Sequence, residues 1–169
     1  EIDGDLEGAS WATGVWGSAL DFDGSNDYVK VAYSSVFDFN DKSMSVGAWI
    51  NIDDNDEAYT IVSNYNDDGD DSRHGYILSS NDAGKLDFTF GFGSSSGSCT
   101  SDAAINGGTW YHVLAQLDDG DIKLYINGEH EKTCNYGNSL SSSSDDLIIG
   151  AHDSNDDGSY SQFLDGIID

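Results

Sequence analysis

The chain has 169 residues, enough for one domain with a sizeable core and too few for two ordinary domains. Its 7 Phe, 9 Tyr and 4 Trp are too many for a disordered chain. Six Lys and Arg against 32 Asp and Glu give a net charge of -26, which would repel nucleic acid and anionic membrane surfaces.

Alternating apolar and polar residues predict β-strands, and no stretch has the apolar spacing of an extended helix. In residues 44–52, Met44, Val46, Ala48, Ile50 and Ile52 fall on one face of a strand. Strands are expected, in chain order, at residues 19–23, 27–31, 44–52, 58–63, 75–79, 86–92, 111–117, 122–127, 129–134, 147–150 and 163–168. So many short strands without intervening helices cannot form βαβ units, so the predicted fold class is all-β, a sandwich or a barrel.

Turn residues separate these strands. Asn127-Gly128 is the dipeptide that a two-residue hairpin prefers, which predicts antiparallel pairing of residues 122–127 with 129–134. The serine-rich stretches 94–98 and 139–144 are expected to be loops within one domain, because strands continue on both sides of each.

Cys99 and Cys134 are the only cysteines, and such an isolated pair predicts one disulfide rather than a zinc site, which would need four ligands. By the chain-entropy relation, the closed loop of about 36 residues would stabilise the fold by roughly 4 kcal/mol. A disulfide implies an oxidising compartment, so we expect a secreted or cell-surface protein. No run approaches the ~18 apolar residues of a membrane span, so no membrane insertion is expected.

The excess of acidic residues lies mostly in Asp-rich, loop-like runs. Such a charge destabilises a compact protein by self-repulsion in dilute buffer, and high salt screens it, so we expect a halophilic protein. Most of these carboxylates are then expected only to hydrate the surface.

Several ordered segments resemble the laminin G-like domains of the concanavalin A-like lectin/glucanase superfamily. They include Ala19-Leu20-Asp21-Phe22-Asp23-Gly24-Ser25-Asn26-Asp27, Gly108-Thr109-Trp110-Tyr111-His112-Val113, Lys123-Leu124-Tyr125-Ile126-Asn127-Gly128 and Phe163-Leu164-Asp165-Gly166-Ile167-Ile168-Asp169. The resemblance implies a jelly-roll sandwich of two antiparallel sheets, formed by residues 1–169 as a single domain of a larger surface or secreted protein. It also implies that Trp11, Trp49 and Trp110 pack in the core.

Calcium is the expected cofactor, because it binds six to eight oxygens of the kind that Asp, Asn and backbone carbonyls supply. In similar sandwiches a structural calcium joins an early turn to the last strand. The resemblance therefore implies a site formed by Asp23, the Gly24 carbonyl, Asp27 and Asp169. The alternative is that Asp23 and Asp27 only form an ordinary Asx-type turn.

A second candidate calcium site follows residue 152. Asp153, Asn155 and Asp157 stand at alternate positions before Gly158, as in the first half of a calcium-binding loop. The twelfth position of that pattern is Leu164 instead of a bidentate Glu, which leaves Asp165 as the candidate distal ligand.

Aromatic residues in polar loops are candidates for sugar binding, since their rings stack on the apolar patches of sugars. Tyr65, Tyr136 and Tyr160 are the first candidates, followed by Tyr59 and Tyr33. The alternative for each is an aromatic that only covers the rim of the sandwich.

Catalysis is not expected. Glycoside hydrolysis needs two suitably placed carboxylic acids, and Glu129-His130-Glu131 lacks the intervening Asp of the hydrolytic relatives. The leading hypothesis is a non-catalytic, calcium-stabilised and monomeric module that binds carbohydrate or glycoprotein for adhesion. A glycoside hydrolase or lyase relative and a structural, protein-contacting spacer remain as alternatives.

Overall fold

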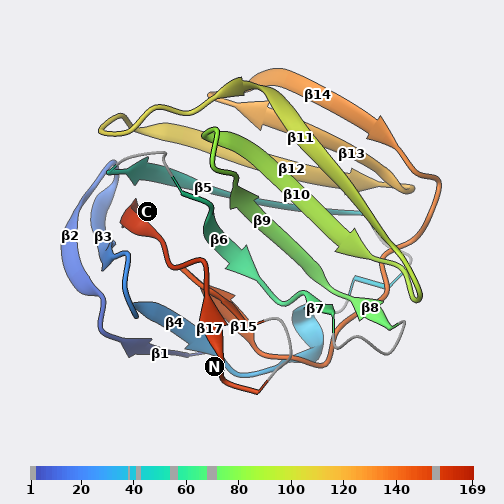
Figure 1. Ribbon diagram of the computed structural model, residues 1–169, viewed down its shortest axis with the longest axis horizontal. Helices are drawn as coiled ribbons and strands as arrows, with labels where there is room; N and C mark the ends of the chain where they lie inside the picture. The colour runs from blue at the N-terminus through green and yellow to red at the C-terminus, as the bar shows by residue number, and fades with distance from the viewer. Residues whose placement is uncertain (1–2, 38, 41–42, 54–56, 68–71, 154–156) are drawn as a thin grey trace.

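The computed structural model describes residues 3–37, 39–40, 43–53, 57–67, 72–153 and 157–169. It is an all-β sandwich of two seven-stranded antiparallel sheets (Figure 1). The strands of sheet A, in spatial order, are β1 (Gly4–Glu7), β4 (Tyr28–Val31), β15 (Leu147–Ile149), β6 (Tyr59–Ser63), β9 (Tyr76–Ser80), β10 (Lys85–Gly91) and β11 (Ser96–Ala104). Those of sheet B are β14 (Glu129–Asn135), β13 (Asp121–Ile126), β12 (Tyr111–Asp118), β5 (Met44–Ile52), β18 (Asp165–Ile168), β3 (Gly17–Asp23) and β2 (Ser10–Gly14).

Two short hairpins complete the described strands. They are β7 (Asn66–Asp67) with β8 (Arg73–His74), and β16 (His152–Asp153) with β17 (Tyr160–Ser161). The described ranges contain a single helical turn, the 3-10 helix Ser35–Phe37, and no helix long and apolar enough to cross a membrane. The predicted all-β class and every predicted strand are therefore confirmed, with ends that differ by up to two residues.

Alternation along β5 directs its side chains to opposite sides of sheet B. Ile50 and Ile52 are buried between the sheets, whereas Trp49 is paired with His112 of β12 on the outer face. The predicted hairpin is also present, because β13 pairs with β14 and both Asn127 and Gly128 have positive φ, at 52° and 81°.

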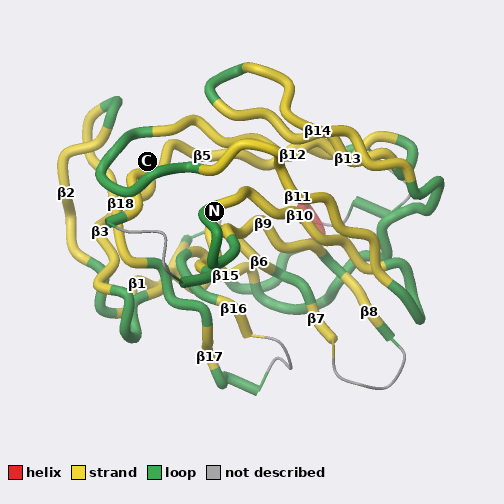
Figure 2. Tube along the Cα trace, turned by 45° about the horizontal axis from the view of Figure 1, so that its top comes forward, coloured by secondary structure: helices red, strands yellow, loops and turns green. Residues whose placement is uncertain are grey.

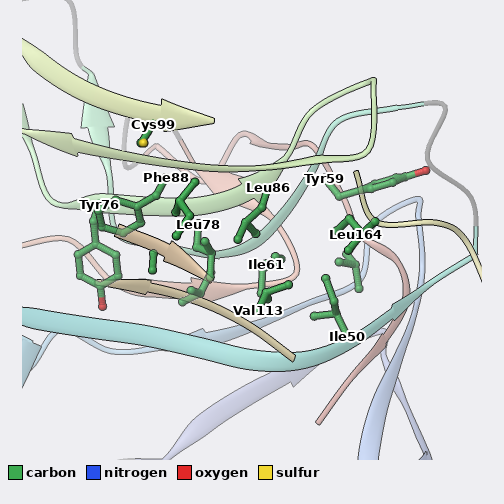
Figure 3. Close-up of a cluster of buried hydrophobic side chains, with 14 of the residues drawn as sticks. Ile50, Tyr59, Ile61, Tyr76, Leu78, Leu86, Phe88, Cys99, Val113 and Leu164 are labelled. Carbon is green, nitrogen blue, oxygen red and sulfur yellow. The ribbon is translucent and has the colours of Figure 1, made fainter. Parts of the chain in front are cut away.

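The core fills the space between the inner faces of the two sheets. Figure 3 shows one part of it, where Ile50 and Val113 from sheet B face Leu78, Leu86 and Phe88 from sheet A. All five side chains are buried, and each contributes about 1.5–3 kcal/mol through removal from water.

Strand β6 does not follow the half-buried pattern, since all five of its residues are buried. Its inner face carries Ile61 in the core. Its outer face is covered by the β16–β17 hairpin, which lies on the side of sheet A away from sheet B (Figure 2). Thr60 bonds Gln162 at 3.2 Å and Ser63 Oγ lies 3.0 Å from His152 Nδ1. Sheet A therefore carries a third, partial layer.

The predicted disulfide is confirmed and closes one edge of the sandwich. Cys99 of β11 is bonded to Cys134 of β14, with a Cα–Cα distance of 5.7 Å. These strands are the outermost of sheets A and B at that edge.

Local structure differs from expectation at residues 96–98 and at Trp11, and two strands form where none was predicted. Residues 96–98, expected in a loop, belong to β11. Strands β1 and β2 were not predicted, since their residues are mostly exposed and give no clear alternation. Trp11 on edge strand β2 is 73% exposed rather than packed in the core, because no further strand covers it in the described structure.

Candidate functional site

A polar cleft opens beside the β7–β8 hairpin. It has a volume of about 380 Å³, within the range of small-ligand sites. The described residues that line it come from four separate segments: Tyr33, Asn66, His74, Ser142, Ser143, Ser144 and Asp145. The cleft therefore exists only in the folded chain.

The serine-rich segment forms one wall and is tied firmly to its surroundings. Ser141 donates its N–H to the Gly91 carbonyl at 2.8 Å and accepts the Gly75 N–H at 2.7 Å. Ser142 and Asn40 exchange two hydrogen bonds, of 2.9 and 3.1 Å, between side chain and backbone. The segment is thus a fixed wall, as expected for a loop inside one domain.

Asn66 forms the floor of the cleft. It is only 9% exposed, yet its Oδ1 accepts no hydrogen bond from the described residues. A buried amide oxygen without a donor costs about 1–3 kcal/mol. Its position is fixed because Asn66 is paired with His74 across the hairpin, beside the 3.0 Å ion pair of Arg73 with Asp67. Asn66 Oδ1 is therefore an acceptor without a donor among the described residues, in a residue that lines the cleft.

Tyr33 presents an aromatic ring at the mouth of the cleft and is 43% exposed. Its backbone N–H donates to Asp146 Oδ1 at 2.8 Å, and Asp146 also pairs with Lys30 at 2.7 Å. Burial disfavours ionisation of Asp146, but the Lys30 and Tyr33 hydrogen bonds outweigh it and lower the pKa of this carboxyl. The Tyr33 backbone is therefore anchored while its ring stays accessible.

Neither of the two buried tyrosine candidates can offer a ring face to a sugar. Tyr59 and Tyr65 are both buried, so their assignment to a binding surface is corrected. Tyr65 lies behind the outer face of sheet A, 6.2 Å from the ring of His152, whose pKa is lowered by burial. The polar neighbours of Tyr59 and Tyr65 in the sequence suggest loops, but Tyr59 packs in the core between the sheets and Tyr65 is buried beside His152.

The other two tyrosine candidates already have ring partners. Tyr136 packs edge-on against Phe90 and donates its hydroxyl to the Ser98 carbonyl at 2.6 Å. Tyr160 stacks on Tyr28 with ring centroids 4.0 Å apart, and burial raises the pKa of Tyr160 to about 12. Both contacts are typical of rim aromatics that cover the sandwich.

A second aromatic surface lies on the outer face of sheet B. Trp49 and His112 meet edge to face at 5.4 Å and line a shallow hollow with Asn127 and Gly128. The Asn127 side chain accepts the His112 N–H at 2.9 Å. The expected core role of Trp49 is therefore wrong, and the hollow offers fewer polar groups than the cleft beside Asn66.

A third hollow, of about 450 Å³, is lined by carboxylates at the opposite end of sheet B. Its described lining includes the aspartates Asp21, Asp23, Asp27, Asp53 and Asp165. Asp165 lies opposite Asp23 in the sheet and accepts the Asp53 N–H at its carbonyl. Three aspartates thus follow one another across β3, β18 and the end of β5, where like charges repel.

The turn that contains Asp23 and Asp27 has the Asx-type bonds that were the alternative to calcium binding. Asp23 Oδ1 accepts the Ser25 N–H at 2.9 Å, and buried Asp27 accepts the Asp23 N–H at 3.1 Å. Gly8 is required beside it, because a Cβ there would overlap the Asp27 carboxylate. Gly24 lies against Asp165 in the same way.

Asp169 does not belong to this hollow. It is four residues beyond Asp165, which corresponds to roughly 13 Å along a strand. Its Oδ2 instead accepts the Trp16 N–H at 2.8 Å. The aspartate of the last strand that meets Asp23 is therefore Asp165, and the expected ligand Asp169 is corrected.

The loop after residue 152 uses its carboxylates to form a turn. Asp153 accepts the N–H groups of Asp157 and Gly158, and Asp157 accepts that of Ser159. Asn155, the third candidate ligand there, lies outside the described residues. Across the described ranges, no three His, Cys, Asp or Glu side chains lie close enough together to hold a metal ion.

Comparison with known proteins gives a family and a set of structural neighbours. The family Laminin_G_3, described as the concanavalin A-like lectin/glucanases superfamily, matches residues 23–169. No curated protein matches the chain. The similar solved structures below are all under 20% identical, so they establish the fold alone.

Three of these structures illustrate the range. Domain 4 of an extracellular arabinanase from Geobacillus stearothermophilus, solved with arabinotriose, has a TM-score of 0.70 at 18% identity, covering 98% of this chain and 79% of that one. The carbohydrate-binding module CBM40 of a Ruminococcus gnavus sialidase, bound to α2,3-sialyllactose, has a TM-score of 0.64 at 17% identity, covering 79% of this chain and 75% of that one. Domains LG4-5 of the mouse laminin α1 chain have a TM-score of 0.70 at 15% identity, covering 96% of this chain and 42% of that one.

Proposed function

Because this chain belongs to the laminin G-like family of the concanavalin A-like lectin/glucanase superfamily, we propose that it is a non-catalytic carbohydrate-binding module. Its glycan would bind in the cleft between Tyr33 and Asn66. The observation that carries this proposal is the buried Asn66 Oδ1, which lacks a donor among the described residues and lies in a cleft with an accessible aromatic ring. A sugar hydroxyl would supply the donor while the Tyr33 ring would stack on the sugar's apolar face.

Two of the structural neighbours support this direction, since one was solved with arabinotriose and the other with α2,3-sialyllactose. The composition of the cleft argues against hydrolysis. Its described lining offers one carboxyl group, Asp145, whereas glycoside hydrolysis uses a pair. Glu129, His130 and Glu131 lie elsewhere, on β14, and His130 Nε2 lies 2.8 Å from Thr133 Oγ1.

Calcium is the second part of the proposal. The carboxylate hollow supplies only hard oxygen donors, which suit calcium better than zinc. Asp23, Asp27, Asp53 and Asp165 would hold the ion after drawing closer together than they now stand. Bound there, calcium would neutralise the repulsion between neighbouring strands and stabilise the fold.

The setting of the module completes the proposal. The Cys99–Cys134 disulfide fits a secreted or surface-displayed protein, and the net charge of -26 fits a halophilic environment. An adhesive role as a monomeric module within a larger protein follows from such a location. A spacer that only contacts other proteins would not explain why the buried Asn66 Oδ1 lacks a hydrogen-bond donor among the described residues.

The direct test is glycan binding by a cleft variant and a control variant. Asn66→Ala and Tyr33→Ala should each weaken glycan binding about ten-fold or more, as measured by calorimetry in high salt. Tyr33→Ala is the safer variant for folding, since its ring is already accessible. Trp49→Ala, on the outer face of sheet B, should leave affinity unchanged; loss of binding in this variant alone would move the site to the other sheet.

A further inference from the structure

We infer that the glycan bound by this cleft is electrically neutral and that sugars bearing carboxylates are rejected. The inference rests on the proposed function and adds the class of ligand. It draws on the hydrogen-bonding character of the cleft, the engagement of the nearest cations and the charge of the whole protein.

Two residues that line the cleft, Asn66 and Asp145, carry acceptor oxygens to which a ligand could donate hydrogen bonds. Asn66 Oδ1 has no donor among the described residues, and the carboxylate of Asp145 offers further acceptor oxygens. Ser143 already donates its hydroxyl to Asp145, so that donor is engaged. A sugar hydroxyl can donate to these oxygens, whereas a sugar carboxylate offers only further acceptors.

Two described cations beside the cleft, Arg73 and Lys30, bind partners outside its lining. Arg73, next to His74, binds Asp67 through Nε at 3.0 Å and the Ser94 carbonyl through Nη1 at 3.2 Å. Lys30 binds Asp146 at 2.7 Å. The described lining of the cleft contains no Lys or Arg. The bidentate or point-charge contact that usually holds a carboxylate is therefore missing from the described lining.

Long-range electrostatics act in the same direction. A net charge of -26 repels an anionic sugar before it reaches the cleft. This repulsion is screened at molar salt, where the Debye length falls to about 3 Å. The local mismatch at Asn66 and Asp145 is not screened, because it acts at hydrogen-bond distance. Discrimination against acidic sugars should therefore persist in high salt.

The experiment compares matched trisaccharides that differ only in a hydroxymethyl group or a carboxylate at each residue. Galactotriose with trigalacturonate is one pair; the equivalent gluco and manno pairs, with arabinotriose as a further neutral probe, complete the panel. Binding is measured by calorimetry at about 0.1 M and 2 M sodium chloride. In any pair that binds, the neutral member should be at least about ten-fold tighter at both salt concentrations, and Asn66→Ala should weaken its binding about ten-fold or more.

Two charge variants separate the effect of the Asp145 carboxylate in the cleft from that of the protein's overall negative charge. Asp145→Asn and Asp119→Asn remove the same charge, one in the cleft and one in the β12–β13 turn. Asp145→Asn should reduce the discrimination several-fold and Asp119→Asn should leave it unchanged. An acidic sugar that binds more tightly than its neutral match, and loses binding in Asn66→Ala, would overturn this inference but support the proposed function. Failure of every probe to bind would overturn both.

Discussion

At one edge of the sandwich, β11 and β14 are joined by the Cys99–Cys134 disulfide, whereas at the opposite edge β1 and β2 are joined only by the turn at Gly8. The first edge is reinforced by the Lys132–Asp102 ion pair at 2.7 Å and by the Ala103 N–H bond to Glu131. The second borders the carboxylate hollow and exposes two tryptophans, Trp16, which is 80% accessible, and Trp11. The same fold thus has one edge closed by a covalent bond and one that borders a hollow lined by aspartates.

The largest expected effect is loss of the disulfide. Cys99→Ser with Cys134→Ser should lower the free energy of unfolding by about 4 kcal/mol, since the unfolded chain regains the entropy of an open loop. This corresponds to a melting temperature lower by roughly 8–16 °C for a domain of this size. Thermal melting in the same high-salt buffer measures it. A change of less than about 1 kcal/mol would mean that β11 and β14 hold together without the bond.

Calcium should have the next largest effect, confined to the other edge. At constant high ionic strength, calcium at about 100 times its Kd should add about 2.7 kcal/mol of stability, or roughly 5–10 °C. Asp165→Asn should abolish this response, because it removes a carboxylate from the hollow. Asp169→Asn is the matched control on the same segment and should keep it.

The calcium result has two informative alternatives. If Asp169→Asn loses the response and Asp165→Asn keeps it, the ligand set given by the strand register is wrong. If Asp153→Ala alone loses it, the ion binds in the loop after residue 152. No response in any variant would leave the second edge dependent on general screening only.

The smallest effects concern two ion pairs of equal length, Lys132–Asp102 at the disulfide edge and Lys30–Asp146 near the other. The Lys132 hydrogen bond lowers the pKa of Asp102; at Asp146, burial opposes ionisation but is outweighed by the hydrogen bonds from Lys30 and the Tyr33 N–H, which lower its pKa. Carboxyls with lowered pKa stabilise the fold above their ordinary pKa near 3.8, and that stability is lost as pH falls below it.

Asn variants measure this difference. Asp146→Asn should cost about 0.2–1 kcal/mol at pH 7 and should reduce the acid sensitivity below about pH 4. Asp102→Asn should have a smaller effect, since Asp102 is fully exposed and more strongly screened. Chemical denaturation at pH 7 and pH 3 compares the two. A larger loss of stability in Asp102→Asn than in Asp146→Asn would mean that the ion pair at the disulfide edge contributes more than the one near the other edge.

Much of the fold could be predicted because it depends on local patterns. The alternation in residues 44–52 is sufficient to define β5, and Asn127-Gly128 defines the β13–β14 hairpin through its positive φ angles. A pair of cysteines without other soft ligands has little alternative to a disulfide. These signals do not depend on which strands become neighbours.

The site could not be predicted, because it depends on burial and register. The polar residues around Asn66 give no sign in the sequence that its side chain is buried. Tyr59 is buried in the core between the sheets and Tyr65 beside His152, which their polar neighbours in the sequence do not indicate either. Whether Asp165 or Asp169 meets Asp23 is decided by the pairing of β18 with β3, which no local pattern states. The polar residues between the strands predict loops, but they do not predict which loops lie next to one another in the folded chain.

The position of β18 has a consequence for biosynthesis. This strand lies between β3 and β5, which are made much earlier on the ribosome. Until β18 emerges, both strands present an unpaired backbone edge, and sheet B is divided into two parts. Sheet B therefore lacks one strand between β3 and β5 until residues 165–168 are made. The insertion of β18 must then compete with pairing of these two edges to other chains. Cotranslational holding by a chaperone would be needed most at this stage.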